Sequence, residues 1–180
     1  MAEFQNTIDL IGDGVVVVAI VGKNITEFND DILNKVGSKA LYQCASLTTV
    51  NLPNATEVGS SAFNGCNKLV SAYIPKAITI GNNAFQNCSK LQIADISNAT
   101  RINFQAFAAC KALTTIILRS PTVCTLTDTY TFNSTPFTGV GGTAYVPQSL
   151  ISQYQQATNW STLYAAGTCN FVAIEGSEYE

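Results

Sequence analysis

The sequence predicts an α/β solenoid, in which the chain coils repeatedly and equivalent residues stack from one coil to the next. Two observations carry this prediction: a cysteine that recurs every 22 residues, and a change in apolar spacing inside each repeat. The recurring cysteines are Cys44, Cys66, Cys88 and Cys110. A fixed period of roughly 20 to 50 residues is typical of solenoids and other repeat architectures.

Eight positions recur in register over four copies of the repeat. The window "VGSSAFNGC" ends at Cys66, and the matching window "IGNNAFQNC" ends at Cys88. The second copy contains the eight positions as Val58, Gly59, Ala62, Phe63, Cys66, Leu69, Ala72 and Ile74. Agreement at so many positions defines a repeated structural unit rather than an isolated motif.

Two apolar spacings coexist inside each unit. Ile80, Ala84 and Cys88 are four residues apart, which predicts one face of a short helix. After the cysteine the spacing changes to two, as in Ala72 and Ile74, which predicts a strand. A unit this small cannot bury its apolar face alone, so stacked units should form a parallel sheet on one side and a row of short helices on the other.

The segment "LTTVNLPNATEVGSSAFNGC" resembles the repeat of the BspA-like, or Treponema-type, leucine-rich-repeat family. The resemblance covers residues 36–118, with Ser97 and Arg119 in place of the family proline and Asn103 in place of the glycine. It implies a right-handed leucine-rich-repeat superhelix with a parallel strand face and short convex helices. These departures are substitutions within a repeat and leave the expected fold unchanged.

We expect a single domain over residues 1–180, with a degenerate cap at each end. Residues 1–35 are expected to form the N-terminal cap, because Ile25 and Phe28 imitate Leu47 and Val50 before the pattern fails. Residues 36–122 hold the four repeats. Residues 123–180 are expected to form a degenerate repeat and a C-terminal helical cap, since an open end of the solenoid would expose apolar surface.

The C-terminal cap can be predicted in more detail. "PFTGV" imitates "AFNGC" and places Val140 at the cysteine position, while "TAYVP" imitates the strand segment "SAYIP". Leu150, Tyr154 and Ala157 have helical spacing, which predicts a helix over the end of the core with Trp160 beneath it. The segment after "TAYVP" also resembles the closing segment of BspA-like proteins.

The N-terminal region contains the apolar run "VVVVAIV" at residues 15–21. Seven residues are too few to span a bilayer, which requires about 20, so we predict a buried strand and no membrane span. The sequence shows no secretion signal at its start. Both a secretion route without such a signal and prior removal of a leader remain open.

The recurring cysteines are predicted to be packing residues. Free cysteine behaves as a small apolar group in protein cores, and Val140 at the expected cap position supports that interpretation. Without a C-x-x-C pair or any histidine, neither a zinc site nor another cofactor is predicted. Cys124 and Cys169 lie outside the recurring positions, and a bridge between them remains open.

Composition argues against two classes of function. Charged residues make up 12% of the chain and the net charge is −3, so a nucleic-acid partner is not expected. The absence of histidine excludes a Ser/His or Cys/His catalytic pair. We therefore expect a protein without enzymatic activity.

The outward positions of the predicted strands are the candidate binding site. These residues differ from copy to copy, whereas the buried positions do not. Tyr73, Ile117 and Tyr145 are expected to expose apolar surface, while Asp95 and Arg119 add charge; Tyr and Arg are frequent at interface hot spots. The candidate residues on this concave face are Asn51, Ser71, Tyr73, Ile93, Asp95, Thr115, Ile117, Arg119 and Tyr145. The alternative is a solvated sheet face without a partner.

These observations predict a protein-recognition or adhesion module. The partner is expected to be a protein or a cell-surface glycan, and the chain is expected to be a monomer. The family resemblance implies a location at the bacterial surface or outside the cell. The alternative is a tail-associated structural or attachment protein of a phage or prophage, located in the phage particle.

Overall fold

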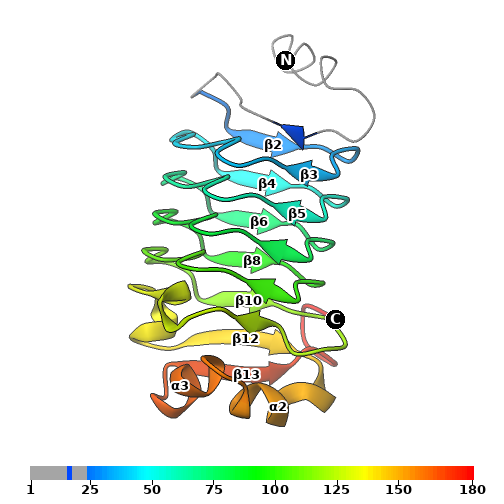
Figure 1. Cartoon of the computed structure of the whole chain (residues 1–180), viewed down its shortest axis with the longest axis vertical. Coiled ribbons are helices and arrows are strands. Elements are labelled where there is room, and N and C mark those ends of the chain that lie inside the picture. Colours follow the sequence, from blue (N-terminus) through cyan, green and yellow to red (C-terminus); the bar gives the residue numbers. More distant parts are fainter. Residues whose placement is uncertain (1–15, 18–23) are drawn as a thin grey trace.

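Each repeat forms one coil, and the coils stack along the long axis of the molecule (Figure 1). The computed structural model describes residues 16–17 and 24–180. Each coil contributes one short strand to each of two parallel sheets, and the apolar side chains fill the space between them. The solenoid predicted from the sequence is therefore confirmed.

The larger sheet contains seven parallel strands. Equivalent residues of successive repeats lie directly opposite one another, since Val50 pairs with Ala72, Ala72 with Ala94 and Ala94 with Ile116. Ala144 continues this row, which confirms the match between "TAYVP" and "SAYIP". The strands are β2 (Glu27–Asn29), β4 (Thr49–Asn51), β6 (Ser71–Tyr73), β8 (Ile93–Asp95), β10 (Thr115–Ile117), β12 (Gly142–Val146) and β13 (Cys169–Ala173).

Among the described residues, the second sheet contains six parallel strands of two residues each. Of the strand predicted over residues 15–21, the described part is β1, which pairs with β3; the rest lies outside the described residues. The strands are β1 (Val16–Val17), β3 (Lys35–Val36), β5 (Glu57–Val58), β7 (Thr79–Ile80), β9 (Arg101–Ile102) and β11 (Thr125–Leu126).

The windows that follow these short strands form turns, so the predicted convex helices are wrong. Ser61 and Gly65 have φ values of +56° and +81°, in the left-handed region that an α-helix does not use. A left-handed residue at every fourth position repeats the turn, which produces the helix-like spacing in the sequence. The amides of Ser61, Phe63 and Gly65 donate to carbonyls of the next coil at 2.7–2.8 Å, whereas a helix would satisfy them within its own turn.

A stack of aromatic rings runs through the core. The Phe63 and Phe85 centroids are 5.0 Å apart and those of Phe85 and Phe107 are 5.2 Å apart, with ring planes within 9° of parallel. Phe132 continues the stack at 5.7 Å from Phe107 and also contacts Trp160. Phe85 and Phe107 each have a ring on both faces, so this repeated position couples the successive coils from Phe63 to Phe132.

The glycines after β5 and β7 lie in close contact with the backbone of the preceding coil, whereas Asn103 takes this position after β9. A Cβ at Gly81 would lie 2.7 Å from backbone atoms of Gly59 and Ser60. Gly59 meets the preceding coil in the same way, at 2.6 Å from the nearest backbone atom. The recurring glycine is thus explained by backbone packing.

The recurring cysteine occupies a buried position where it can donate a hydrogen bond. The Sγ atoms of Cys66, Cys88 and Cys110 donate to backbone carbonyls of the preceding coil at 3.0–3.1 Å. The prediction for Val140 is wrong, because its side chain is 93% exposed. Thr135 takes the equivalent position. Its amide donates a hydrogen bond to the Phe132 carbonyl, as the Cys110 amide does to the Phe107 carbonyl.

The C-terminal end of the coiled core is closed by a degenerate segment, whereas most of the predicted N-terminal cap lies outside the described residues. At the N-terminal end, Phe28 is buried and pairs with Val50 as predicted. At the C-terminal end, Tyr154 and Trp160 are buried against the last coils, which confirms the helical cap. The helical segments are η1 (Thr129–Phe132), η2 (Pro136–Thr138), η3 (Gln148–Leu150), α2 (Ile151–Gln156) and α3 (Trp160–Ala165). The strand β13 was not predicted.

Candidate functional site

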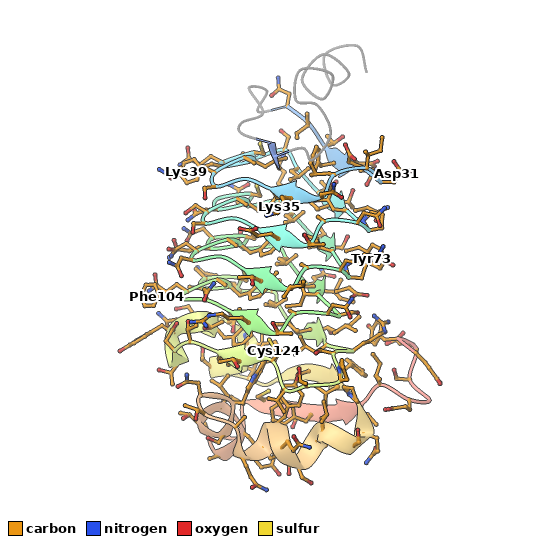
Figure 2. The ribbon with its side chains drawn as sticks, turned by 45° about the vertical axis from the view of Figure 1, so that its right-hand side comes forward. Asp31, Lys35, Lys39, Tyr73, Phe104 and Cys124 are labelled. Carbon is orange, nitrogen blue, oxygen red and sulfur yellow. The ribbon has the colours of Figure 1, made fainter. Side chains whose placement is uncertain are left out.

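The outward side chains of β4, β6, β8, β10 and β12 define a surface that we call the strand face. Its side chains alternate with the buried residues of the same strands, because successive residues of a strand point to opposite sides. Figure 2 shows Tyr73 and Phe104 on opposite sides of the stack. Their exposed fractions are similar, at 46% and 44%, so Phe104 provides a matched reference residue away from the strand face.

The nine predicted residues differ widely in exposure. Asn51, Tyr73 and Arg119 are exposed, whereas Asp95 is only 8% exposed. Ile117 was predicted to be exposed, and this is wrong because its exposed fraction is 2%. The half-buried members of the set are Ser71, Ile93, Thr115 and Tyr145.

Asp95 is buried within a hydrogen-bonded cluster on the strand face. One carboxylate oxygen accepts from the Ser97 hydroxyl at 2.5 Å and from the Ser97 amide at 3.2 Å. The other accepts from Arg119 Nη1 at 3.0 Å. The carboxylate therefore holds the planar guanidinium in place. Arg119 Nη1 also donates to the Ser97 hydroxyl oxygen, and Nη2 donates to the Tyr179 carbonyl.

A hollow of about 540 Å³ adjoins this cluster at the ends of the strands. It brings together three of the predicted residues, Tyr73, Asp95 and Arg119. The remaining lining residues are Pro53, Asn54, Pro75, Lys76, Ser97, Asn98 and Glu180. An aromatic ring, a guanidinium group and an ammonium group thus surround a single open space.

Sequence reasoning missed Asn54, Lys76 and Asn98 as candidate site residues. These three are equivalent positions of successive repeats, each directly after the proline position, and all line the hollow. Lys76 Nζ donates to Asn54 Oδ1 at 2.6 Å. Their variation from copy to copy was visible in the sequence, so extending the outward row past each strand would have identified them.

Residues 174–180 fold back onto the C-terminal half of the strand face. In Figure 1 this closing segment lies beside β10 and β12. The Arg119 guanidinium donates to the Tyr179 carbonyl, and the Tyr179 ring contacts the Tyr145 ring with centroids 4.7 Å apart. Ile117 lies in register between Asp95 and Tyr145, next to these contacts, which explains its burial.

The six cysteines are buried in the core, and none of them lines the hollow. All six are thiols, and burial raises the pKa of the Cys88 thiol well above its ordinary value and that of Cys169 to about 12. Cys124 lies beneath the cap. Its amide donates a hydrogen bond to the Tyr154 hydroxyl, and its carbonyl accepts one from the Trp160 indole. Within residues 16–17 and 24–180, no three histidine, cysteine or acidic side chains gather as a metal site would require.

The described part of the chain also contains no helix long and apolar enough to cross a bilayer. The structure is a repeat scaffold with a variable strand face and a hollow at the ends of its strands. This architecture defines the class of the protein as a parallel β-solenoid built from leucine-rich repeats.

Comparison with known proteins identifies the family. The model of the BspA-type leucine-rich repeat region matches residues 22–141 in six copies, so the chain belongs to this family. No curated protein matches the chain.

Two solved structures are similar to this one. A leucine-rich repeat protein from Bacteroides ovatus is 16% identical with a TM-score of 0.44; the match covers 71% of this chain and 41% of that protein. The leucine-rich repeat protein of Treponema pallidum is 16% identical with a TM-score of 0.40, covering 89% of this chain and 92% of that one. This chain therefore corresponds to less than half the length of the Bacteroides protein.

Proposed function

We propose that this chain is a non-enzymatic recognition module that binds a protein partner through the strand face. The family and the solenoid fold are typical of proteins that act through interactions rather than catalysis. Adhesion at a bacterial surface is the setting that the family suggests. The site itself must be argued from this chain's own residues.

The contrast between constant and variable positions supports the strand face most strongly. Buried positions such as Leu69 and Leu91 repeat unchanged, whereas the outward positions at Tyr73, Asp95 and Ile117 carry different chemistry in successive coils. Because the buried positions hold the scaffold together, the outward row can vary without loss of the fold. Extended faces of this kind are the binding surfaces that solenoid proteins commonly use.

The hollow supplies the most favourable part of this surface. Tyr73 offers a rigid ring with little entropy to lose, and Arg119 is already oriented by Asp95. Preorganised aromatic and guanidinium groups contribute strongly to protein interfaces because fewer side-chain rotations must be immobilised on binding.

The test uses the full chain as bait against a display library of random peptides. Enriched peptides are then measured against two substituted chains, Tyr73→Ala and Phe104→Ala. Loss of one hot-spot side chain should weaken binding at least about tenfold for Tyr73→Ala, while Phe104→Ala should bind like the unsubstituted chain. Equal binding by all three chains, or loss with Phe104→Ala alone, would show that the strand face is not the site.

A further inference from the structure

Residues 174–180 form an ordered turn rather than an extended tail. The amide of Ser177 donates to the Ile174 carbonyl at 3.0 Å, and the Ser177 hydroxyl donates to the same carbonyl at 2.6 Å. The Tyr179 amide then donates to the Ser177 hydroxyl oxygen at 3.1 Å. These bonds preorganise the turn, and Tyr179 lies directly after them.

The contacts of this turn with the strand face involve groups that a binding site would use. Arg119 donates to the Tyr179 carbonyl, and the Tyr179 ring meets the Tyr145 ring edge to face. Partial burial and the neighbouring Glu178 carboxylate raise the pKa of the Tyr179 hydroxyl. Glu180 continues into the hollow. The turn therefore occupies candidate site residues on both β10 and β12.

Charge around the hollow complements an acidic occupant. Without residues 174–180, the charged lining groups are Lys76, Arg119 and Asp95, which sum to +2 − 1 = +1. Glu180 brings this sum to zero. A locally cationic hollow is unusual in a chain whose net charge is −3, and it favours carboxylate-bearing segments over basic ones.

We propose that the strand face binds an acidic peptide segment that carries an aromatic side chain, and that residues 174–180 are an intramolecular competitor for this site. The inference rests on the proposed function and adds the chemistry of the partner. A partner peptide places its aromatic ring on Tyr145 and an acceptor oxygen on Arg119, and it displaces the turn. The turn thereby lowers the apparent affinity for weak ligands of the same chemistry.

The experiment follows the Ile117 methyl signals by NMR in the full chain and in a full chain carrying Tyr179→Ala. The probe is a synthetic peptide with the sequence of residues 174–180, Ile-Glu-Gly-Ser-Glu-Tyr-Glu. Tyr179→Ala alone should shift the Ile117 signal, because the covering ring is lost. A short tethered segment acts at a millimolar effective concentration, and the turn is bound in the structure, so the free peptide should bind the substituted chain with a Kd of about 0.1 mM.

In the unsubstituted chain the tethered turn should compete, and the same peptide should bind at least about tenfold more weakly. A control peptide with alanine in place of tyrosine should bind neither chain. A second control, with all three glutamates replaced by glutamine, should bind the substituted chain more weakly at low salt. The Phe104→Ala chain should behave like the unsubstituted one.

Three outcomes would overturn the proposal. One is an unchanged Ile117 signal in Tyr179→Ala, which would mean that the turn does not cover this face. Another is equal peptide affinity for both chains, and the third is no binding to the substituted chain at about 10 mM peptide. Library peptides that bind through Tyr73 but are basic or lack an aromatic side chain would leave the proposed function standing and refute this inference alone.

Discussion

Replacing Phe85 with alanine should be among the most destabilising single changes in this chain. Phe85 is fully buried in the middle of the aromatic stack, with neighbouring rings at 5.0 and 5.2 Å. Truncating a buried phenylalanine costs about 3 to 5 kcal/mol. Because each of two ring contacts is worth about 0.5 to 1.5 kcal/mol beyond burial, we expect the upper end, a loss of about 5 kcal/mol.

The matched control is Phe104→Ala. This side chain is 44% exposed, and its ring contact is an edge-on approach to Tyr130 at 6.4 Å, so its removal should cost about 1 kcal/mol or less. Guanidinium unfolding followed by circular dichroism measures both free energies. Since neighbouring coils stabilise one another, Phe85→Ala should also broaden the transition. If the two variants lose unfolding free energy to within about 1 kcal/mol of each other, the role assigned to the aromatic stack is refuted.

Three further predictions concern packing and ionisation. Gly81→Ala should lower the free energy of unfolding by about 3 kcal/mol, because the added methyl group would overpack against backbone. Gly167 has a φ of +70° and no atom within 4 Å of the added Cβ, so Gly167→Ala should lower it by only about 1 kcal/mol. Equal losses for the two variants in urea unfolding would contradict this prediction. Stability under reducing conditions should fall above about pH 8.5, the ordinary thiol pKa, because the unfolded chain releases protons that buried thiols such as Cys88 and Cys169 retain. Each thiol should account for about 1.4 kcal/mol at pH 9.5, and a flat profile from pH 7.5 to 9.5 would contradict it. Finally, Cys66 and Cys88 in the native chain should resist a thiol reagent and react once denaturant is added; rapid native labelling would show that these positions are open.

The repeat period determined most of the fold in advance. Apolar positions that recur every 22 residues must stack, so the parallel sheet and its register followed directly, down to the pairing of Phe28 with Val50 and of Ala144 with Ile116. The helical cap followed from the spacing of Leu150 and Tyr154. In each case burial against a neighbouring coil leaves few alternative arrangements.

The turns were mispredicted because a left-handed residue at every fourth position imitates helical spacing. Lys39 and Ser61 adopt φ values of +59° and +56° although neither residue type favours the left-handed region, so local propensity gave no warning at these positions. Hydrogen bonds to the next coil stabilise this conformation, and such bonds cannot be read from a single repeat. Tertiary contacts here override local preference.

The candidate site was predicted only in part, again because tertiary contacts decide some of its features. The outward row on the strands followed from alternation, and Tyr73, Asp95 and Arg119 do meet at one hollow. The burial of Ile117 did not follow, because it arises from a segment 60 residues further along, which Arg119 bonds through the Tyr179 carbonyl. Contacts outside the repeat have no periodic signature in the sequence.

The most direct test of the account places a photo-crosslinking side chain at Tyr73 or, in a matched chain, at Phe104. Both positions are exposed to a similar extent and lie on opposite sides of the stack. With a peptide enriched from the display library present, the account predicts a crosslinked product from the chain modified at Tyr73 and none from the chain modified at Phe104. Crosslinking at Phe104 alone, or equally at both positions, would contradict the strand face as the recognition surface.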